Sequence, residues 1–384
     1  MTPVKCAEMD DLVHESSVAS NVEHLYIHIP FCAAKCGYCA FYSRPGSTEQ
    51  MSDCVDAVLA ELERLAPQLV PATIFIGGGT PTVLSLELLR RLLKGSAARV
   101  PLGGVGEWTV ECNPATVDGE KVELFREFGV NRISMGVQSF DDALLKAIGR
   151  IHSAKAAVAT YELLRQSGFE NINLDLMFGL PGQTITHFRD TLRRAIELQP
   201  EHISVYCLIL ERETEFWRQF QSGRLSTNEE QNAAMYELAI DTLEAAGYRQ
   251  YEVSNFAKPG CECVHNIAYW KVEDYIGLGP SACSTVGTRR WQNAFDTERY
   301  IAAMRKGEEA LAYEEVVTPK LRAAERAAFG MRMNAGVPAE LVRGHWDKEI
   351  AELLSAELVQ WRNGRLAPTR RGILFADEVS AEFV

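Results

Sequence analysis

The sequence predicts an α/β fold, with a barrel-like parallel sheet followed by a mainly helical C-terminal region that has a small winged-helix-like end. Three observations support this prediction. Short segments rich in β-branched and aromatic residues alternate with amphipathic helical segments between residue 24 and about residue 210. Glycines and polar residues follow nearly every predicted strand, as on the active face of a barrel. Beyond residue 210, helical periodicity dominates.

The six predicted strands span residues 24–29, 73–76, 108–111, 132–137, 171–177 and 202–207. The helices predicted between them span residues 53–65, 86–93, 118–128, 154–167 and 186–198. Successive βα units imply parallel strands with right-handed crossovers. An open doubly wound sheet would gather its motifs at one switch point. Motifs distributed over several strand ends therefore favour a barrel.

Downstream, the pattern predicts a long helix over 228–246 and a stretch rich in Gly, Pro and Cys over 251–288. Further helices are predicted over 297–306, 320–333, 338–342 and 347–355, then a hairpin from 358–361 and 364–366 and a last helix over 368–376. We therefore expect four parts: a loose leader (1–23), the barrel (24–215), a connecting region (216–295) and a helical C-terminal domain (296–384).

The composition excludes several classes of protein. A formal net charge of −13 over 384 residues argues against nucleic acid as the main partner, since phosphate binding relies on clustered Lys and Arg. No apolar stretch approaches the ~20 residues that span a bilayer. The first 23 residues match neither a secretory signal nor a transit peptide. Ten irregularly spaced cysteines do not form a disulfide framework. We expect a cytoplasmic protein.

The most informative motif is C-x3-C-x2-C, formed by Cys32, Cys36 and Cys39 just after the first predicted strand. One loop with this spacing brings three thiolates to three corners of a cubic cluster. Position 41 is Phe, so no fourth cysteine follows closely and one iron keeps an open site. Zinc ligands usually form two separated pairs, and no second pair lies nearby. The motif thus predicts a [4Fe–4S] cluster, ahead of zinc or a disulfide loop.

Polar residues and glycines follow the later strands. The run Gly77–Pro81 (G-G-G-T-P) lets the backbone approach a ligand closely through exposed N–H groups and carbonyls, or forms only a tight turn. Glu111, Gln138 and Arg150 lie at or beyond strand ends. Asp175 lies in an apolar strand, where burial is costly unless it binds a ligand or pairs with Arg150. Such groups suit a zwitterionic, sugar-bearing ligand such as S-adenosylmethionine (SAM), which can also occupy the open iron.

These motifs resemble the radical SAM superfamily and, within it, the group around oxygen-independent coproporphyrinogen III dehydrogenase. The matching runs are Y-I-H-I-P-F-C-x3-C-x2-C, G-G-G-T-P, E-C-N-P, G-V-Q-S-F, I-G-R and L-D-L-M-F-G-L-P-G. The resemblance implies a partial (β/α)6 barrel with a helical C-terminal domain. It also implies that Cys32, Cys36 and Cys39 bind the cluster. The residues implied at the cofactor are Tyr26 near the methionine group, Tyr38 near the cluster, Gly78, Gly79, Thr80 and Glu111 against SAM, and Gln138, Arg150 and Asp175 in the same cavity.

Two features indicate the branch of this group. The dehydrogenase carries a further cysteine two residues after the third, where this chain has Phe41. The shorter heme chaperone branch carries H-N-x-x-Y-W, present here as His265 to Trp270. His265 is the candidate axial ligand of heme iron, with Tyr269 and Trp270 against the porphyrin. The alternative is a hydrogen-bonding histidine with core aromatics. Cys283 stands where many chaperone-type members carry His.

Two functions from different classes follow from the resemblance. The first is a heme chaperone, which binds heme and passes it to client apo-hemoproteins. The alternative is an oxygen-independent coproporphyrinogen III dehydrogenase, which makes protoporphyrinogen IX by oxidative decarboxylation through a 5′-deoxyadenosyl radical. Phe41 and the H-N-x-x-Y-W motif favour the carrier, and no catalytic residue is assigned. The implied partners are heme or porphyrin, a reductant such as flavodoxin or ferredoxin, and a membrane surface touched peripherally.

Overall fold

The computed structural model describes residues 21–384. The predicted leader lies outside these residues except for its last three positions, and two of those already belong to strand β1 (Val22–Ile29). All six predicted strands are present; the second is longer than predicted, and the other five start within two residues of the predicted positions. The other five are β2 (Leu69–Gly78), β3 (Glu107–Cys112), β4 (Arg132–Gln138), β5 (Ile172–Phe178) and β6 (His202–Cys207). Each pairs in parallel with the next, as βα units require.

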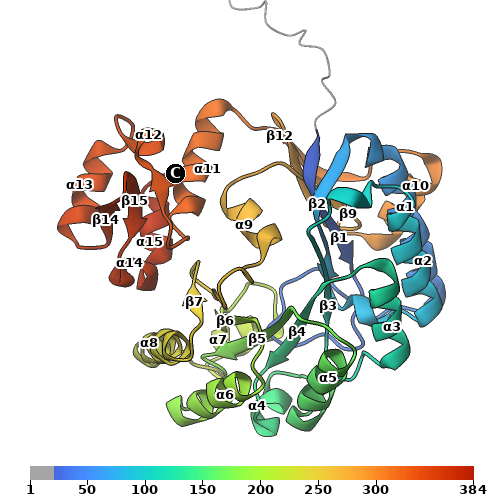
Figure 1. The fold of residues 1–384 in the computed structure, drawn as a ribbon, viewed down its shortest axis with the longest axis horizontal. Coiled ribbons are helices and arrows are strands. Elements are labelled where there is room, and N and C mark those ends of the chain that lie inside the picture. The colour runs from blue at the N-terminus through green and yellow to red at the C-terminus, as the bar shows by residue number, and fades with distance from the viewer. Residues whose placement is uncertain (1–20) are drawn as a thin grey trace, which may run out of the picture.

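Helices follow these strands and cover the outer side of the curved sheet (Figure 1). Their starts agree with capping chemistry: the Ser47 side chain accepts from the Gln50 N–H in a capping box, and Asp118 caps the third helix. The helices are α1 (Thr48–Leu65), α2 (Leu86–Ala97), α3 (Gly119–Phe128), α4 (Asp142–Ala147), α5 (Ala154–Gln166) and α6 (Ile185–Glu197). Of these, only the short α4 was not predicted.

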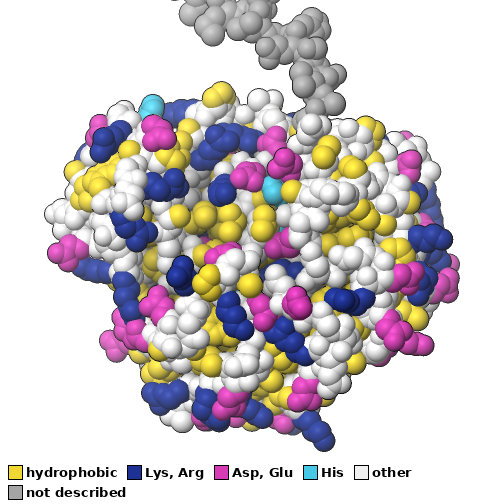
Figure 2. Space-filling view, viewed as in Figure 1, with side chains coloured by type: hydrophobic (Ala, Val, Ile, Leu, Met, Phe, Trp, Pro, Cys, Tyr) yellow, Lys and Arg dark blue, Asp and Glu magenta, His cyan; other side chains and the backbone are white. Residues whose placement is uncertain are grey.

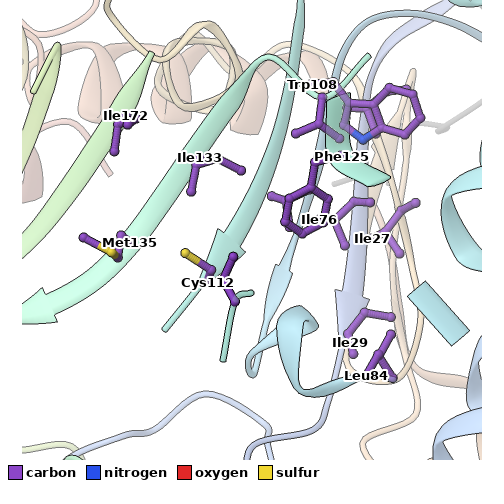
Figure 3. Packing of buried hydrophobic residues seen from close by; sticks show 14 of the residues in the cluster. Ile27, Ile29, Ile76, Leu84, Trp108, Cys112, Phe125, Ile133, Met135 and Ile172 are labelled. Carbon is purple, nitrogen blue, oxygen red and sulfur yellow. The ribbon is translucent and has the colours of Figure 1, made fainter. Parts of the chain in front are cut away.

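The main hydrophobic core lies between the sheet and these helices. Figure 3 shows Ile27, Ile76, Trp108 and Ile133 on neighbouring strands, packed in one layer with Phe125 of α3. Successive side chains of a strand point to opposite faces. The residues that alternate with this apolar layer therefore point to the inside of the barrel, and many of them are polar. This alternation is what gives the barrel a polar interior.

The predicted connecting region is not a linker, because it extends the sheet at both edges. The twelve-stranded sheet has the order β12-β11-β10-β9-β1-β2-β3-β4-β5-β6-β8-β7. Its additional strands are β7 (Arg249–Gln250), β8 (Asn255–Ala257), β9 (Tyr275–Leu278), β10 (Cys283–Val286), β11 (Arg289–Asn293) and β12 (Leu311–Val316). β9 pairs in parallel with β1, whereas β8 pairs antiparallel with β6. These short strands carry too few residues to show a periodic pattern.

A buried carboxylate joins the late strands to the first helix. Glu61 of α1 accepts hydrogen bonds from the Gly279 N–H at 2.9 Å, the Asn293 side chain at 2.8 Å and the Tyr300 hydroxyl at 2.6 Å. Tyr300 lies in α10 (Thr297–Lys306), which packs on α1. The segment up to β12 therefore belongs to the barrel, although the sequence placed a domain boundary at residue 296.

A small C-terminal module has its own hydrophobic core, which includes Val342, Leu366 and Phe383. The predicted hairpin is present and forms a three-stranded sheet of order β13-β15-β14. Its elements are α11 (Pro319–Gly330), β13 (Val337–Pro338), α12 (Ala339–Val342), α13 (Asp347–Ser355), β14 (Val359–Arg362), β15 (Arg365–Pro368), α14 (Arg370–Leu374) and α15 (Ala376–Ala381). No helix formed by residues 21–384 is both long and apolar enough to cross a membrane.

Three helices lie between β6 and β9 in the chain: α7 (Glu215–Gln221), α8 (Glu229–Ala245) and α9 (Val264–Trp270). The sequence predicted α8 but neither α7 nor α9. Figure 1 shows α9 on the inner side of the sheet, facing the C-terminal module. This short helix carries the H-N-x-x-Y-W motif. Its position decides what that motif contacts.

Candidate functional site

The three motif cysteines lie on the loop that leaves β1, at the carboxyl end of the parallel strands. Backbone hydrogen bonds fix both ends of this loop: the Arg44 N–H donates to the Pro30 carbonyl at 2.9 Å, and the Cys32 N–H donates to the Arg44 carbonyl at 3.1 Å. The thiols of Cys32, Cys36 and Cys39 are free and half-buried. The sequence therefore places three unpaired sulfur ligands on one fixed loop.

These donors fit a [4Fe–4S] cluster. Within residues 21–384, no three His, Cys, Asp or Glu side chains converge on the position of a single metal ion. A cluster does not require such convergence, because each of its cysteines binds a different iron. Phe41 occupies the place of a fourth close cysteine, and its side chain is 71% exposed. The loop thus offers three thiolates and no fourth.

The glycine run after β2 does not present free N–H groups to a ligand, contrary to one expectation from the sequence. The N–H groups of Gly78, Gly79 and Thr80 all donate within the protein. Their acceptors are, in order, the Glu111 carboxylate at 3.1 Å, the Ile29 carbonyl at 2.8 Å and the Phe31 carbonyl at 2.7 Å. The run therefore fastens the end of β2 to the start of the cysteine loop.

The same run needs glycine because other groups pack against its backbone. A Cβ atom at Gly77 would lie 2.7 Å from the Glu111 carboxylate. Gly78 has φ +105°, and a Cβ atom there would lie 2.5 Å from the His28 ring. L-residues with side chains rarely adopt this conformation. The glycines thus let Glu111 and His28 approach the backbone of β2 from inside the barrel.

A chain of polar contacts connects the cysteine loop to two other strand ends. The Thr80 hydroxyl lies 3.5 Å from the Cys32 sulfur and accepts from the Asn113 side chain at 2.6 Å. Arg150 donates to the Asn113 side-chain carbonyl, and its Nη1 lies 3.8 Å from the Cys36 sulfur. Asn113 lies in the E-C-N-P motif but was not among the site residues predicted from the sequence. Asn113 joins the β2 turn to the loop after α4.

Asp175 accepts hydrogen bonds from uncharged donors. It does not form an ion pair with Arg150, which was one of the two possibilities predicted from the sequence. It accepts from the Ser134 hydroxyl at 3.3 Å and the Asn173 side chain at 2.8 Å. The Arg150 guanidinium instead donates to Asn113 and to the Gly136 carbonyl. Burial raises the pKa of Asp175, and its hydrogen-bond donors oppose that rise. The Asp175 carboxylate therefore remains available to a ligand on the inner wall of the barrel.

Glu111 is the second carboxyl group on this wall. Burial, with the nearby Asp175 carboxylate, raises the pKa of Glu111 to about 8. The Gly78 N–H and the Arg132 guanidinium partly offset this rise in the pKa of Glu111. Two buried carboxyl groups that face each other resist ionisation together. A cationic ligand between them would favour the ionised forms.

The remaining predicted site residues line the same end of the barrel. The Tyr26 hydroxyl donates to His28 Nδ1 at 3.0 Å, since His28 Nε2–H donates to the Tyr42 carbonyl at 2.9 Å. Gln138 ends β4 beside a register shift and has φ +66°, an uncommon conformation for a residue with a side chain. Tyr38 packs against Phe216, with ring centroids 6.4 Å apart.

The candidate heme ligand His265 is buried inside the barrel. It is 1% exposed, and its ring stacks on Phe75 at 5.1 Å between centroids. Both ring nitrogens are engaged: Nδ1 with the Thr73 hydroxyl at 2.7 Å and Nε2 with the Tyr269 hydroxyl at 3.1 Å. Burial, then the charges of His24 and Arg132, lowers the pKa of His265 to about 3. These contacts are those of the structural alternative, and the role of His265 as an axial ligand of heme stays a prediction.

Buried polar contacts hold α9 inside the barrel. Glu107 accepts from the Val264 N–H at 3.0 Å and the His265 N–H at 3.1 Å. His24 contacts the Thr73 hydroxyl through Nδ1 at 2.9 Å and the Glu273 carboxylate through Nε2 at 2.9 Å. Thr73 is therefore shared by two histidines. The sequence did not predict this network, because its members come from β1, β2, β3 and α9.

Replacing Thr73 by Val should destabilise the protein. The two histidine Nδ1 atoms would lose their shared hydroxyl, and at least one would remain buried without a partner. We expect a loss of about 1–3 kcal/mol in the free energy of unfolding, measured by denaturant titration. Thr73→Ser, which retains the hydroxyl, is the matched control and should lose less. Equal stability of Thr73→Val and the wild type would contradict a structural role for this network.

Comparison with known proteins agrees with this fold. The model of the radical SAM superfamily matches residues 26–195. "Heme chaperone HemW" of Bacillus subtilis is 38% identical over 374 residues, which cover 94% of this chain and 98% of that protein. Its namesake from Mycobacterium tuberculosis is 34% identical over 92% of this chain and 93% of that protein. The solved coproporphyrinogen III oxidase (HemN) of Escherichia coli aligns with a TM-score of 0.83 and 25% identity, over 95% of this chain and 90% of that one.

The parallel barrel, the three-cysteine loop and the family match define a radical SAM protein. Membership of that superfamily implies a [4Fe–4S] cluster and SAM. Within the superfamily, the chain belongs to the HemW family, since it aligns with members of that family over nearly the full length of both chains.

Proposed function

We propose that the protein is a heme chaperone, which binds heme and delivers it to client apo-hemoproteins. The observation that carries this proposal is the alignment with proteins named HemW over 94% of this chain. Phe41, at the place of the further cysteine of the dehydrogenase, supports the same function. The barrel would hold the cluster and SAM, and the C-terminal module would be available for heme or a client.

Cys32, Cys36 and Cys39 are proposed as the cluster ligands, with Tyr38 beside them. Bound together, the cluster and SAM supply one-electron chemistry. The chain's own groups would bind and orient the cofactor. Glu111 and Asp175 offer carboxylates to its cationic and hydroxyl groups, and Arg150 fixes the loop that reaches Cys36. The residues proposed to contact SAM or line its cavity are Tyr26, Gly78, Gly79, Thr80, Glu111, Gln138, Arg150 and Asp175.

The proposed heme surface lies where α9 meets the C-terminal module. The Trp270 and Phe329 rings lie 6.2 Å apart, and Phe329 is 40% exposed. The Arg332 guanidinium lies 5.3 Å from the Trp270 ring. Hydrophobic side chains also gather over α9 at the centre of this face (Figure 2). Aromatic faces suit a porphyrin plane, and a guanidinium suits a propionate.

The decisive experiment uses the anaerobically reconstituted protein with SAM. Heme is added to one sample and followed by absorbance, then transferred to an apo-hemoprotein. Coproporphyrinogen III and a reductant are added to a second sample, and products are identified by mass spectrometry. Stable heme binding and transfer without porphyrin turnover would support the chaperone. Failure to bind or transfer heme would contradict it.

Trp270→Ala should weaken heme binding by at least about fivefold, because stacking of aromatic rings contributes on the order of 1 kcal/mol beyond buried area. Trp361→Ala is a matched control. The ring of Trp361 also packs against a guanidinium, since Arg343 lies 4.6 Å from the ring centroid. Trp361, however, is in β14 of the C-terminal hairpin, away from α9 in the chain. Heme titration of both variants measures the difference. Equal heme affinity of both variants would remove the α9 surface from the proposal.

The dehydrogenase remains the second candidate function. The complete set of residues proposed for SAM favours it, as does the fold match to the Escherichia coli coproporphyrinogen III oxidase. Formation of protoporphyrinogen IX in the second sample would establish this activity. Phe41 would then be a tolerated difference from the cysteine of the dehydrogenase.

A further inference from the structure

The first residue of α10 contacts the part of the cysteine loop that returns to the barrel (residues 39–44, here called the return arm). Thr297 is 1% exposed, and its N–H donates to the Tyr42 hydroxyl at 3.1 Å. The hydroxyl groups of Tyr42 and Thr297 also hydrogen-bond to each other at 2.9 Å. The first N–H groups of a helix have no partner within that helix. Tyr42 therefore supplies an acceptor to a helix end that lies 255 positions away in the chain.

Tyr42 is also connected to the wall proposed for SAM. Its carbonyl accepts from His28 Nε2–H at 2.9 Å, and His28 Nδ1 accepts from the Tyr26 hydroxyl at 3.0 Å. Tyr26 is the residue proposed to lie near the methionine group of SAM. A chain of hydrogen bonds thus runs from Thr297 of α10 through Tyr42 and His28 to Tyr26.

The return arm is tied to the rest of the cysteine loop by Lys35. The Lys35 ammonium donates to the Phe41 carbonyl and to the Ser43 carbonyl, each at 3.2 Å. These two carbonyls flank Tyr42, and Lys35 directly precedes Cys36. A displacement of Tyr42 would therefore reach Cys39 along the return arm and Cys36 through Lys35.

The neighbouring ion pair contributes less to this connection. Arg44 of the return arm pairs with Glu298 of α10, with Arg44 Nη1 3.2 Å from the carboxylate. The two side chains are 33% and 54% exposed. Ion pairs that are exposed to solvent contribute little to stability. The buried contact between Tyr42 and Thr297 is therefore the main attachment of the return arm to α10.

We propose that Tyr42 is a positioning residue, which through Thr297 fixes the cysteine loop relative to Tyr26 and so prepares both surfaces for one SAM molecule. This inference rests on the cluster ligands and SAM contacts proposed above. Tyr42 itself touches neither group in this scheme. A ligand that contacts two surfaces binds more tightly when they are already ordered, because ordering them costs free energy.

Tyr42→Phe tests the proposal, since it keeps the ring and the carbonyl and removes only the hydroxyl. SAM affinity should fall about fivefold, measured by calorimetry on the reconstituted, unreduced protein and normalised to iron content. The change that SAM produces in the electron paramagnetic resonance spectrum of the reduced cluster should also become smaller. Thr297→Val should lose part of the affinity, and Thr297→Ser, which keeps the hydroxyl, should bind like the wild type. The double variant should lose no more than Tyr42→Phe, because both changes remove the same contact.

Tyr248→Phe is the matched control. The Tyr248 hydroxyl is also buried and donates to the Pro200 carbonyl at 2.8 Å, outside both the cysteine loop and α10. Its removal should lower the stability of the protein and leave SAM affinity and the spectrum unchanged. Heme titration of the same samples tests the chaperone function separately, because none of these residues lies on the proposed heme surface.

Wild-type SAM affinity and spectrum in iron-replete Tyr42→Phe would overturn the proposal. An equal loss in Tyr248→Phe, or additive losses in the double variant, would do the same. Should Tyr42→Phe lose its iron, Thr297→Val and Thr297→Ser decide the question, and equal SAM binding by these two variants overturns the proposal. Absence of SAM binding by the iron-replete wild type would overturn the proposed SAM site, and this inference with it.

Discussion

Cys36→Ser is expected to abolish the broad brown absorbance of the anaerobically reconstituted protein. Cys36 is the central member of the three-cysteine loop, and its sulfur lies 3.9 Å from the Gly149 carbonyl. A serine hydroxyl is a poor ligand for iron compared with a thiolate, so one corner of the cluster would lose its attachment. Iron and acid-labile sulfide are measured together with the absorbance. Loss of the cluster should be nearly complete.

Cys261→Ser is the matched control for this experiment. Cys261 is another free, half-buried cysteine, but it lies outside the loop between Cys32 and Cys39. The control should retain its full iron content. Retention of a full cluster by Cys36→Ser would contradict the assignment of the three-cysteine loop. Equal loss of iron in both variants would show that the effect is not specific to that loop.

Gly79→Ala is expected to damage both stability and SAM binding, although it adds one methyl group. A Cβ atom at Gly79 would lie 2.5 Å from the Phe31 carbonyl and 2.9 Å from the Ile29 carbonyl. Both contacts are with backbone, so no flexible side chain can move aside. Gly79 would also lose its hydrogen bond to Ile29 if the strands separate. We expect a loss of about 1–3 kcal/mol or more in the free energy of unfolding.

The same displacement should move the cysteine loop away from the glycine run, because Phe31 directly precedes Cys32. SAM affinity should therefore fall by at least about tenfold, which is the effect of about 1.4 kcal/mol. Gly119→Ala is the control: a Cβ atom there has no neighbour within 4 Å, and alanine favours the helix that Gly119 begins. Wild-type SAM binding by Gly79→Ala would show that the glycine run and the cysteine loop are not coupled.

Local patterns in the sequence were sufficient to predict the six parallel strands of the barrel and most of the helices between them. Strands β1 to β6 each carry a buried apolar run, and helices of 10 to 18 residues such as α1 and α3 show clear periodicity and caps. The cysteine spacing and the glycine run also follow from local sequence, because each motif is one short continuous segment. Strands β7 to β12 have two to six residues each, and the segments that hold them show no dominant pattern.

The sequence by itself determined the chemistry available: three thiolates on one loop, glycines at the end of β2, and carboxyl groups on two of the parallel strands. Only the tertiary structure decided which groups meet. Thr73 and His265 are 192 positions apart, and their hydrogen bond joins the candidate heme ligand to β2 inside the barrel. Asn113 acquires its role in the same way, through contacts with Thr80 and Arg150. Periodicity records which face of an element is buried, whereas hydrogen bonds and charge pairs between distant elements depend on how the sheet closes.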